Sequence, residues 1–411
     1  MSVTEFRAKA FVLLISFFFC ALMMASCLPP EPPYEGVGYL IIAPEILMPA
    51  TDDFSAYKEA EGFLVDRVSL EQIRTRSMGR DDPEKVRNYL VPYSESTPER
   101  EFVLLVGSMD VMPMRIAYPD PQDHSAQTNV PTDFYYEELT GDWDADGDGF
   151  FGEYGDDMSQ DTEDYRAELC VGRIPWDEPG QVQAICERAM LFEQDTSSRI
   201  ARAMTAGATI AATCDTAVVL NMVESLILEP SGYETVSLYE NCPRAHPDFP
   251  LTREDFIGQW EAREPGFVFM FSHGSPYGAG SREQSAYFID VDHLPQGADP
   301  AVAVTSGCSV GAPDSVYPSL GRVLVRDGVC ASFLGASRIT WYGEDPFPVL
   351  VGAYASAMSL IVERRALGEA KIAFIESYAK AERAPDNLSG PRFHQNLFLQ
   401  MLYGDPSLQL R

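Results

Sequence analysis

Short apolar runs of strand length alternate with helix-like segments along most of this chain of 411 residues. Each run ends in a turn of small or polar residues. Alternation of this kind predicts a parallel β-sheet covered by helices, that is, an α/β fold. The pattern restarts after the polar break QDTSS at residues 194–198. Because the chain exceeds the size at which a single core stops growing, we expect two adjacent subdomains, residues 37–197 and 198–411.

Two of the apolar runs end in a reactive side chain. VFMFSHGSPYG carries His273, and AVAVTSGCSVG carries Cys308, 35 residues later. The segment between them, residues 281–296, reads as loop and short helix. The carboxyl ends of parallel strands meet at one edge of a sheet, so we expect both side chains at facing loop tips. An imidazole base beside a thiol nucleophile is a catalytic arrangement, and the amides of Gly274 and Cys308 are the expected oxyanion donors.

The His-Gly block, followed by a second apolar block that ends in cysteine, resembles the caspase-like superfamily of cysteine peptidases. YLIIAPEILMPA, FVLLVGSMDVMP, ELCVGRIP, GASRITWYG and NLFLQMLYGDPSLQL resemble the gingipain family in particular, and they run in this order from residue 39 to residue 410. The resemblance implies caspase-like parallel sheets flanked by helices. It also implies an endopeptidase that acts on polypeptides and needs no redox or nucleotide cofactor.

The resemblance assigns two residues to substrate binding. GASRITWYG is similar to the gingipain segment that walls the pocket for the residue before the scissile bond, which places Trp341 in that wall. Arginine-selective gingipains have an acidic residue at a position that matches Asp215, or Thr216 after a shift of one residue. Asp215 would pair there with a substrate arginine or lysine. The alternatives are that Trp341 is a core aromatic residue and that Asp215 caps the helix that follows it.

The first 26 residues resemble a bacterial lipoprotein signal peptide. A basic start precedes an apolar stretch of 16 residues, from 10 to 25, which is shorter than the ~20 needed to span a bilayer as a helix. Cys27 then occupies the position of a cysteine that is diacylated after cleavage, and the proline-rich residues 27–36 form an extended tether. We therefore expect a lipid-anchored protein of the bacterial cell envelope, on the outer or the cytoplasmic membrane, facing the periplasm or the exterior. An ordinary cleaved signal is the alternative.

Acidic residues outnumber basic ones by 62 to 30, which gives a net charge of −32. Repulsion from phosphate groups argues against nucleic acid and acidic lipid surfaces as partners. The charge therefore limits the partners and names none.

Part of this acidity forms an ordered pattern, DWDADGDGFFGE, at residues 142–153. Carboxylates at alternating positions can wrap one Ca²⁺, and Gly147 permits the sharp turn between them. The flanking sequence is loop-like, so we expect a calcium loop outside any helix pair, with a structural role; a solvated acidic loop is the alternative. The expected ligands are Asp142, Asp144, Asp146, Asp148 and Glu153.

These features predict a gingipain-like cysteine endopeptidase at the cell envelope, with Cys308 as nucleophile and His273 as base. The same pair could instead pass the acyl group to an amine, in a transpeptidase or another protein-processing enzyme. A catalytically inactive, calcium-binding surface lipoprotein that keeps the fold is the second alternative.

Overall fold

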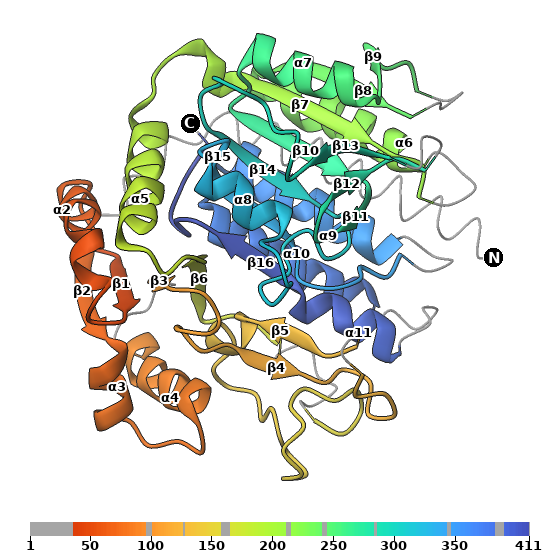
Figure 1. Cartoon of the computed structure of the whole chain (residues 1–411). Helices are drawn as coiled ribbons and strands as arrows, with labels where there is room; N and C mark the ends of the chain where they lie inside the picture. The colour runs from red at the N-terminus through yellow and green to blue at the C-terminus, as the bar shows by residue number, and fades with distance from the viewer. Residues whose placement is uncertain are drawn as a thin grey trace.

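The computed structural model describes residues 36–95, 101–125, 128–157, 165–210, 215–240, 245–282, 286–342, 347–382 and 390–410. Within these residues, one sheet of 11 strands crosses the molecule (Figure 1). Neighbouring strands run parallel except β15 and β16, which are antiparallel. The strands, in order across the sheet, are β2 (Leu64–Ser69), β1 (Gly38–Ala43), β3 (Glu101–Val106), β6 (Leu169–Ile174), β16 (Gln400–Tyr403), β15 (Cys330–Ala336), β14 (Ala301–Thr305), β10 (Phe267–Phe271), β7 (Arg202–Gly207), β8 (Glu234–Tyr239) and β9 (Phe249–Pro250). The predicted α/β class is confirmed.

The sheet has two halves that meet at β6 and β16. The strands β2, β1, β3 and β6 come from the earlier part of the chain, and the remaining strands come from residue 202 onward. The seam has a single register pair, Arg173 opposite Tyr403. The two neighbouring sheets expected from the sequence are therefore joined edge to edge into one.

Three strands of the first half, β1, β3 and β6, are short apolar runs because helices cover both of their faces. Every residue of β1, β3 and β6 is buried. A parallel sheet covered on both sides selects continuous apolar runs in place of the alternating pattern of a half-exposed sheet. This is why the runs could be recognised in the sequence.

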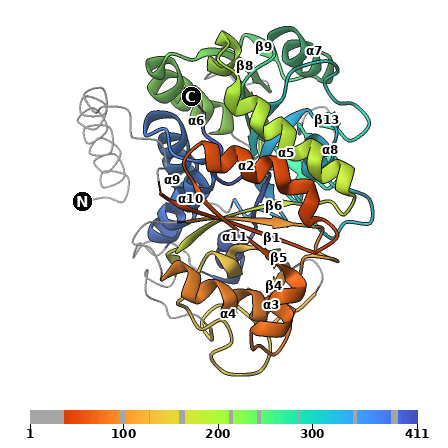
Figure 2. The ribbon, with the colours of Figure 1, turned by 90° about the vertical axis from the view of Figure 1, so that its left-hand side faces the viewer.

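Helices cover both faces of the sheet. Figure 2 shows α5 and α8 on one side of it and α9 and α10 on the other. Successive residues of β15 point to opposite faces of the sheet. Phe333 faces α8, since a Cβ added to Gly321 of that helix would touch the Phe333 ring. Leu334 faces α9 across a cavity that both line. The helices are α2 (Asp52–Ala60), α3 (Leu70–Arg76), α4 (Asp82–Ser94), α5 (Pro179–Gln194), α6 (Asp215–Val223), α7 (Arg253–Arg263), α8 (Leu320–Arg326), α9 (Phe347–Ala357), α10 (Leu367–Glu382) and α11 (Pro391–Phe398).

Two small sheets lie outside the large one: β4 (Arg115–Ala117) with β5 (Val130–Thr132), and β11 (His273–Ser275), β12 (Gly278–Gly280) and β13 (Tyr287–Asp290) in a row. The expectation of loop and short helix at residues 281–296 was wrong at β13. This strand of four residues forms because β12 offers a free edge and because Phe288 packs on Phe256, with ring centroids 4.8 Å apart.

Among the described residues, no helix is both long and apolar enough to cross a membrane. The signal segment and Cys27 lie outside the described residues.

Candidate active site

The loops that carry His273 and Cys308 follow neighbouring parallel strands. β10 pairs with β14 from Phe267 opposite Val302 to Met270 opposite Thr305, so both strands end at the same edge of the sheet. The two loops are in direct contact there. A Cβ added to Gly274 would lie 2.7 Å from both the amide nitrogen and the carbonyl oxygen of Cys308. The juxtaposition of the two loops expected from the sequence is therefore present in the fold.

The imidazole of His273 is held by a backbone carbonyl. Its Nε2 lies 3.1 Å from the carbonyl oxygen of Thr209, which is the second residue after β7. A carbonyl can only accept, so Nε2 must donate and therefore carries the proton. The other ring nitrogen, Nδ1, is then the basic one. Among the described residues, the His273 imidazole is hydrogen-bonded to Thr209, and the Cys308 thiol contacts Thr340 instead of the imidazole.

A buried carboxylate supports Thr209 in turn. Oε2 of Glu240 accepts hydrogen bonds from the amide of Thr209 at 2.6 Å and from the amide of Arg282 at 3.2 Å. Glu240 follows β8 and is only 5% exposed. Thr209 and Glu240 were not expected from the sequence, because a backbone carbonyl leaves no mark on residue identity and because Glu240 lies in a different strand-and-loop unit.

Cys308 is half-buried at the start of a tight turn. Its Sγ lies 3.8 Å from the carbonyl oxygen of Thr340. Burial raises the pKa of the Cys308 thiol, while hydrogen bonding to the backbone at Thr340 and at Cys308 itself acts in the opposite direction. The next residue, Ser309, has a φ of 57° and donates its amide to Arg338 at 2.9 Å. A non-glycine residue in this left-handed region is uncommon and indicates a backbone held by its surroundings.

Trp341 lies next to the residue that contacts the thiol. Its main chain is clamped by Asn396 of α11, which accepts from the Trp341 amide at 2.9 Å and donates to the Trp341 carbonyl at 2.8 Å. The ring is half-buried and carries the exposed guanidinium of Arg392 at 4.5 Å from its centroid. Trp341 is thus a half-buried residue with a fixed main chain, and not a fully buried core residue.

A small apolar cavity lies beneath the Cys308 turn, between the sheet and α9 with α10. Its volume is about 40 Å³, and Ser306 and Thr340 lie at the end nearest to Cys308. A water molecule takes roughly 30 Å³ in the liquid. The cavity is therefore large enough to hold water.

Of the other expected site residues, Gly274 lies in β11 opposite Ala279, with its backbone against Cys308. Asp215 is the first residue of α6, and its side chain lies outside the described part of the structure. The alternative Thr216 is buried and donates its hydroxyl to the Ala208 carbonyl, so its side chain serves the fold.

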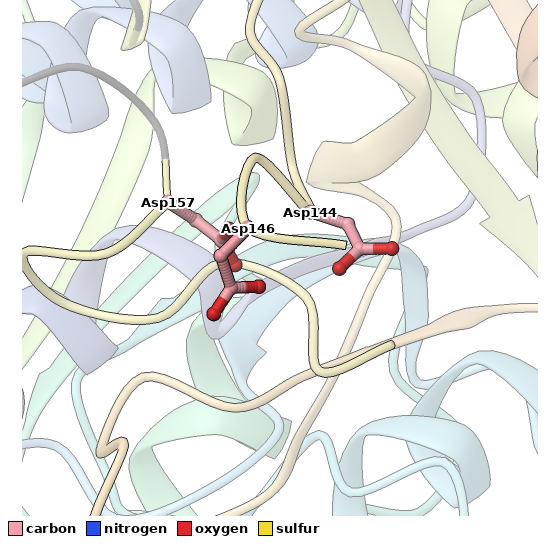
Figure 3. Close-up of side chains that lie close together, drawn as sticks. All are labelled: Asp144, Asp146 and Asp157. Carbon is pink, nitrogen blue, oxygen red and sulfur yellow. The ribbon is translucent and has the colours of Figure 1, made fainter. Parts of the chain in front are cut away.

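The acidic loop brings several carboxylates together, and one of them was not expected from the sequence. Asp144, Asp146 and Asp157 each offer an oxygen within 4.8 Å of the others (Figure 3). Burial raises the pKa of Asp157 to about 6, because a charge far from water is costly. Asp157 lies beyond the twelve-residue motif, so a motif reading could not include it.

A second group shares Asp146 with Asp148 and Glu153, again within 4.8 Å. Asp142 belongs to neither group and instead accepts from the Asp144 amide at 3.3 Å. The loop therefore gathers four of the five expected carboxylates and adds one more. Carboxylate oxygens at this density are the donor set that Ca²⁺ prefers.

The family model for peptidase family C25 matches residues 33–411. No curated protein matches the chain. Two solved structures are similar with a TM-score of 0.69 and 15% identity: the Arg-specific cysteine proteinase gingipain R, over 93% of this chain and 80% of that chain, and the complex of Porphyromonas gingivalis RgpB pro- and mature domains, over 91% and 79%. A third, described as the structure of a protease, has a TM-score of 0.67 and 16% identity over 91% of this chain and 78% of its own. These likenesses show a shared fold.

Proposed function

The chain belongs to peptidase family C25 and is a cysteine-type peptidase, and we propose that it is a gingipain-like endopeptidase of the cell envelope with Cys308 as nucleophile and His273 as base. The observation that carries this proposal is the contact between the Gly274 and Cys308 backbones at the ends of two neighbouring strands. The hydrogen bond from His273 to Thr209 supports it, because it leaves Nδ1 as the basic nitrogen.

In the proposed reaction, Nδ1 of His273 takes the proton of the Cys308 thiol, and Sγ attacks the carbonyl carbon of the scissile peptide. The amides of Gly274 and Cys308 stabilise the oxyanion. The C–N bond then breaks, sulfur keeps the acyl group as a thioester, and the imidazolium returns its proton to the leaving amine. Water, deprotonated by the same nitrogen, hydrolyses the thioester and restores the thiol.

The residue before the scissile bond would lie beside Trp341, whose wall borders Cys308 through Thr340. Asp215, at the start of α6, would pair with an arginine or lysine at this position. The preference for arginine or lysine is a further proposal, and the peptidase activity does not depend on it.

The test is to incubate the full chain with a panel of peptides, with and without amine acceptors, and to identify the products by mass spectrometry. We expect hydrolysis by the wild-type protein and none by Cys308→Ala or His273→Ala. Cys186→Ala, a buried thiol in α5, and His293→Ala, a half-exposed histidine, serve as controls that keep activity. Cleavage by Cys308→Ala at the wild-type rate overturns the mechanism, and conjugated products identify a transpeptidase. If no peptide yields a hydrolysed or a conjugated product, the result favours a surface protein without turnover.

We also propose that the acidic loop binds one structural Ca²⁺, with Asp144, Asp146, Asp148, Glu153 and Asp157 as the carboxylate donors. Five negative groups in one loop repel one another, and a divalent cation among them removes that cost. The guanidinium of Arg80 already pairs with Asp144, which supports a need for positive charge at this place.

The lipid anchor is a separate proposal. Diacylation of Cys27 would hold the protein on the envelope through the proline-rich tether. Mass spectrometry of the mature amino terminus tests it: we expect a lipid-modified Cys27 as the first residue. An unmodified terminus at another position contradicts the anchor without affecting the peptidase proposal.

A further inference from the structure

Large exposed apolar side chains of the second half of the sheet lie in two loops beside the candidate active site. Among the described residues from 202 to 410 they are Tyr277, Val316 and Tyr317, which are 42%, 93% and 81% exposed. Tyr277 lies four residues after His273, and the other two lie in the loop that begins at Cys308. The remaining exposed large apolar side chains belong to the earlier part of the chain: Ile46, Leu64, Met78 and Leu191.

The two loops meet, because the amide of Leu320 donates to the carbonyl of Pro276 at 2.8 Å. Pro276 precedes Tyr277, and Leu320 follows Tyr317 by three residues. We call Tyr277, Val316 and Tyr317 the apolar rim. Single exposed apolar side chains are common on protein surfaces, but a group confined to the two loops that carry the reactive residues is a feature of a binding surface.

The loop under Val316 and Tyr317 is firmly anchored. Asp314 accepts two hydrogen bonds from the guanidinium of Arg338, at 2.8 and 2.5 Å. The amide of Gly311 donates to Ala336 at 2.8 Å, on the neighbouring strand. The exposure of the rim is therefore a property of a well-ordered loop, and binding a ligand there costs little ordering entropy.

The apolar rim and Trp341 lie next to helices on opposite faces of the sheet. From Cys308 the chain runs through the rim loop into α8, on one face of the sheet. From Trp341 it runs towards α9, on the other face (Figure 2). An extended polypeptide that crosses the edge of the sheet at Cys308 therefore contacts Trp341 on one side of the scissile bond and the rim on the other.

Two carboxylates near the rim are hydrogen-bonded within the chain. Asp314 is bound by Arg338, and Asp292 accepts from the hydroxyl of Tyr277. The charge of Asp314 is thus compensated by a guanidinium, whereas Asp292 is hydrogen-bonded to a neutral hydroxyl and keeps its charge. We propose that the apolar rim binds an apolar side chain of the polypeptide substrate on the carboxyl-terminal side of the scissile bond. This inference rests on the proposed function and names the substrate chemistry of the same site.

The experiment compares two peptides that share the sequence up to a bond the wild-type protein cuts in a denatured protein mixture. One continues with four residues that include leucine and phenylalanine, and the other continues with serine and glycine. The variant is the double substitution Val316→Ser with Tyr317→Ser in the full chain. The matched control is Ile46→Ser with Met78→Ser, two residues that are 77% and 85% exposed in the other half.

We expect the wild-type protein to cut the apolar peptide with about tenfold higher kcat/KM, mainly through KM, and the rim variant to lose this preference. The cut of the serine-glycine peptide should be unchanged, and the control variant should behave as wild type. Equal kcat/KM for the two peptides in the wild-type protein, or an unchanged ratio in the rim variant, overturns the inference.

A binding experiment distinguishes failure of the proposed peptidase function from failure of the rim proposal. If no peptide is cut, the fluorescence anisotropy of labelled Leu-Phe-Leu-Phe and Ser-Gly-Ser-Gly peptides with Cys308→Ala protein still tests the rim. Tighter binding of the apolar peptide, lost with Val316→Ser and Tyr317→Ser added, supports the rim as a binding surface for apolar chains. Equal binding of the two peptides rejects it.

Discussion

The carbonyl oxygen of Thr209 accepts a hydrogen bond from Nε2 of His273 at 3.1 Å, and this contact fixes which nitrogen of the ring can act as a base. A carbonyl can only accept, so this contact favours the Nε2–H tautomer of the neutral ring. In the proposed site, the role that a carboxylate has in many catalytic triads would fall to the main chain, with Glu240 one step further away.

Removing the Glu240 carboxylate should impair turnover more than substrate binding. With Glu240→Ala the Thr209 amide loses its acceptor, and we expect kcat to fall by about tenfold with little change in KM, because a small displacement of the base is costly. Glu240→Gln keeps an acceptor oxygen and should retain most of kcat. The ¹⁵N shifts of the His273 ring should show a mixture of tautomers only in the alanine variant. Equal losses in both variants contradict the assignment, and Glu234→Gln, on the exposed start of β8, is the control.

Adding one methyl group at Gly274 should disrupt the site. The new Cβ of Gly274→Ala would lie 2.7 Å from backbone atoms of Cys308, which cannot rotate away as a side chain can. We expect kcat/KM to fall by about a hundredfold and the free energy of unfolding to fall by about 1–3 kcal/mol. Peptide cleavage and urea unfolding measure these effects. Gly258→Ala in α7, where a Cβ meets nothing within 4 Å, should lose neither; wild-type kinetics in Gly274→Ala would falsify the close approach of the two loops.

Alkylation of Cys308 should increase with pH in the alkaline range. Burial disfavours the thiolate and raises the thiol pKa, so less thiolate is present at neutral pH than in a free cysteine, whose pKa is about 8.5. The rate of modification by iodoacetamide in the resting protein should therefore have its midpoint above that of a free cysteine. A midpoint below neutrality would mean that a thiolate–imidazolium pair already exists before substrate binds.

Arg392 should weaken the binding of cationic substrates. Its guanidinium occupies a face of Trp341 and repels a second positive charge. For Arg392→Ala, we expect the ratio of kcat/KM for a peptide with arginine before the scissile bond to one with glutamine to rise by about two- to fivefold. Arg76→Ala, an exposed arginine in α3, should leave this ratio unchanged. An unchanged ratio for Arg392→Ala would mean that the substrate side chain does not approach this ring.

Calcium should raise the melting temperature, and Asp157 should contribute to that effect. Free ligand at 100 times its dissociation constant adds about 2.7 kcal/mol to the free energy of unfolding. Asp157→Asn should lose much of the shift between excess Ca²⁺ and chelator, whereas the neighbouring exposed Asp156→Asn should keep it. Because this loop lies between β5 and β6, in the part of the chain that precedes His273 and Cys308, chelation should lower the melting temperature more than initial rates measured in the cold. If the wild-type protein has the same melting curve with excess Ca²⁺ and with chelator, the loop does not bind calcium as proposed.

The sequence predicted the elements whose signal is local. The runs that became β10 and β14 are apolar, short and followed by glycine turns, so the positions of His273 and Cys308 at one sheet edge could be predicted. Contacts made through the backbone could not, since the Thr209 carbonyl would be present with almost any side chain at that position. The same holds for Asp157, which reaches the acidic loop from outside its motif.

The order of the strands was also beyond the sequence pattern. β16 pairs with β15 in the antiparallel direction and with β6 in the parallel direction. The residues of a strand do not by themselves indicate which strands will pair with it. β13 was missed because four residues carry too little periodicity to be separated from a loop.

The place of β16 sets an order for folding. β6 and β15 belong to different halves, and the strand between them consists of residues 400–403, so the halves become one sheet only after almost all of the preceding chain has been synthesised. Until then each half has an unpaired edge, the part of a sheet most prone to wrong association. Within the sheet the joint consists of the pair of Tyr403 with Arg173 and of the Gly404 amide donating to the Arg173 carbonyl at 2.9 Å, and the buried ion pair between Lys371 and Glu137 also connects the halves. Because residues 400–403 complete the sheet, we expect the two halves to be joined as a closing step of assembly.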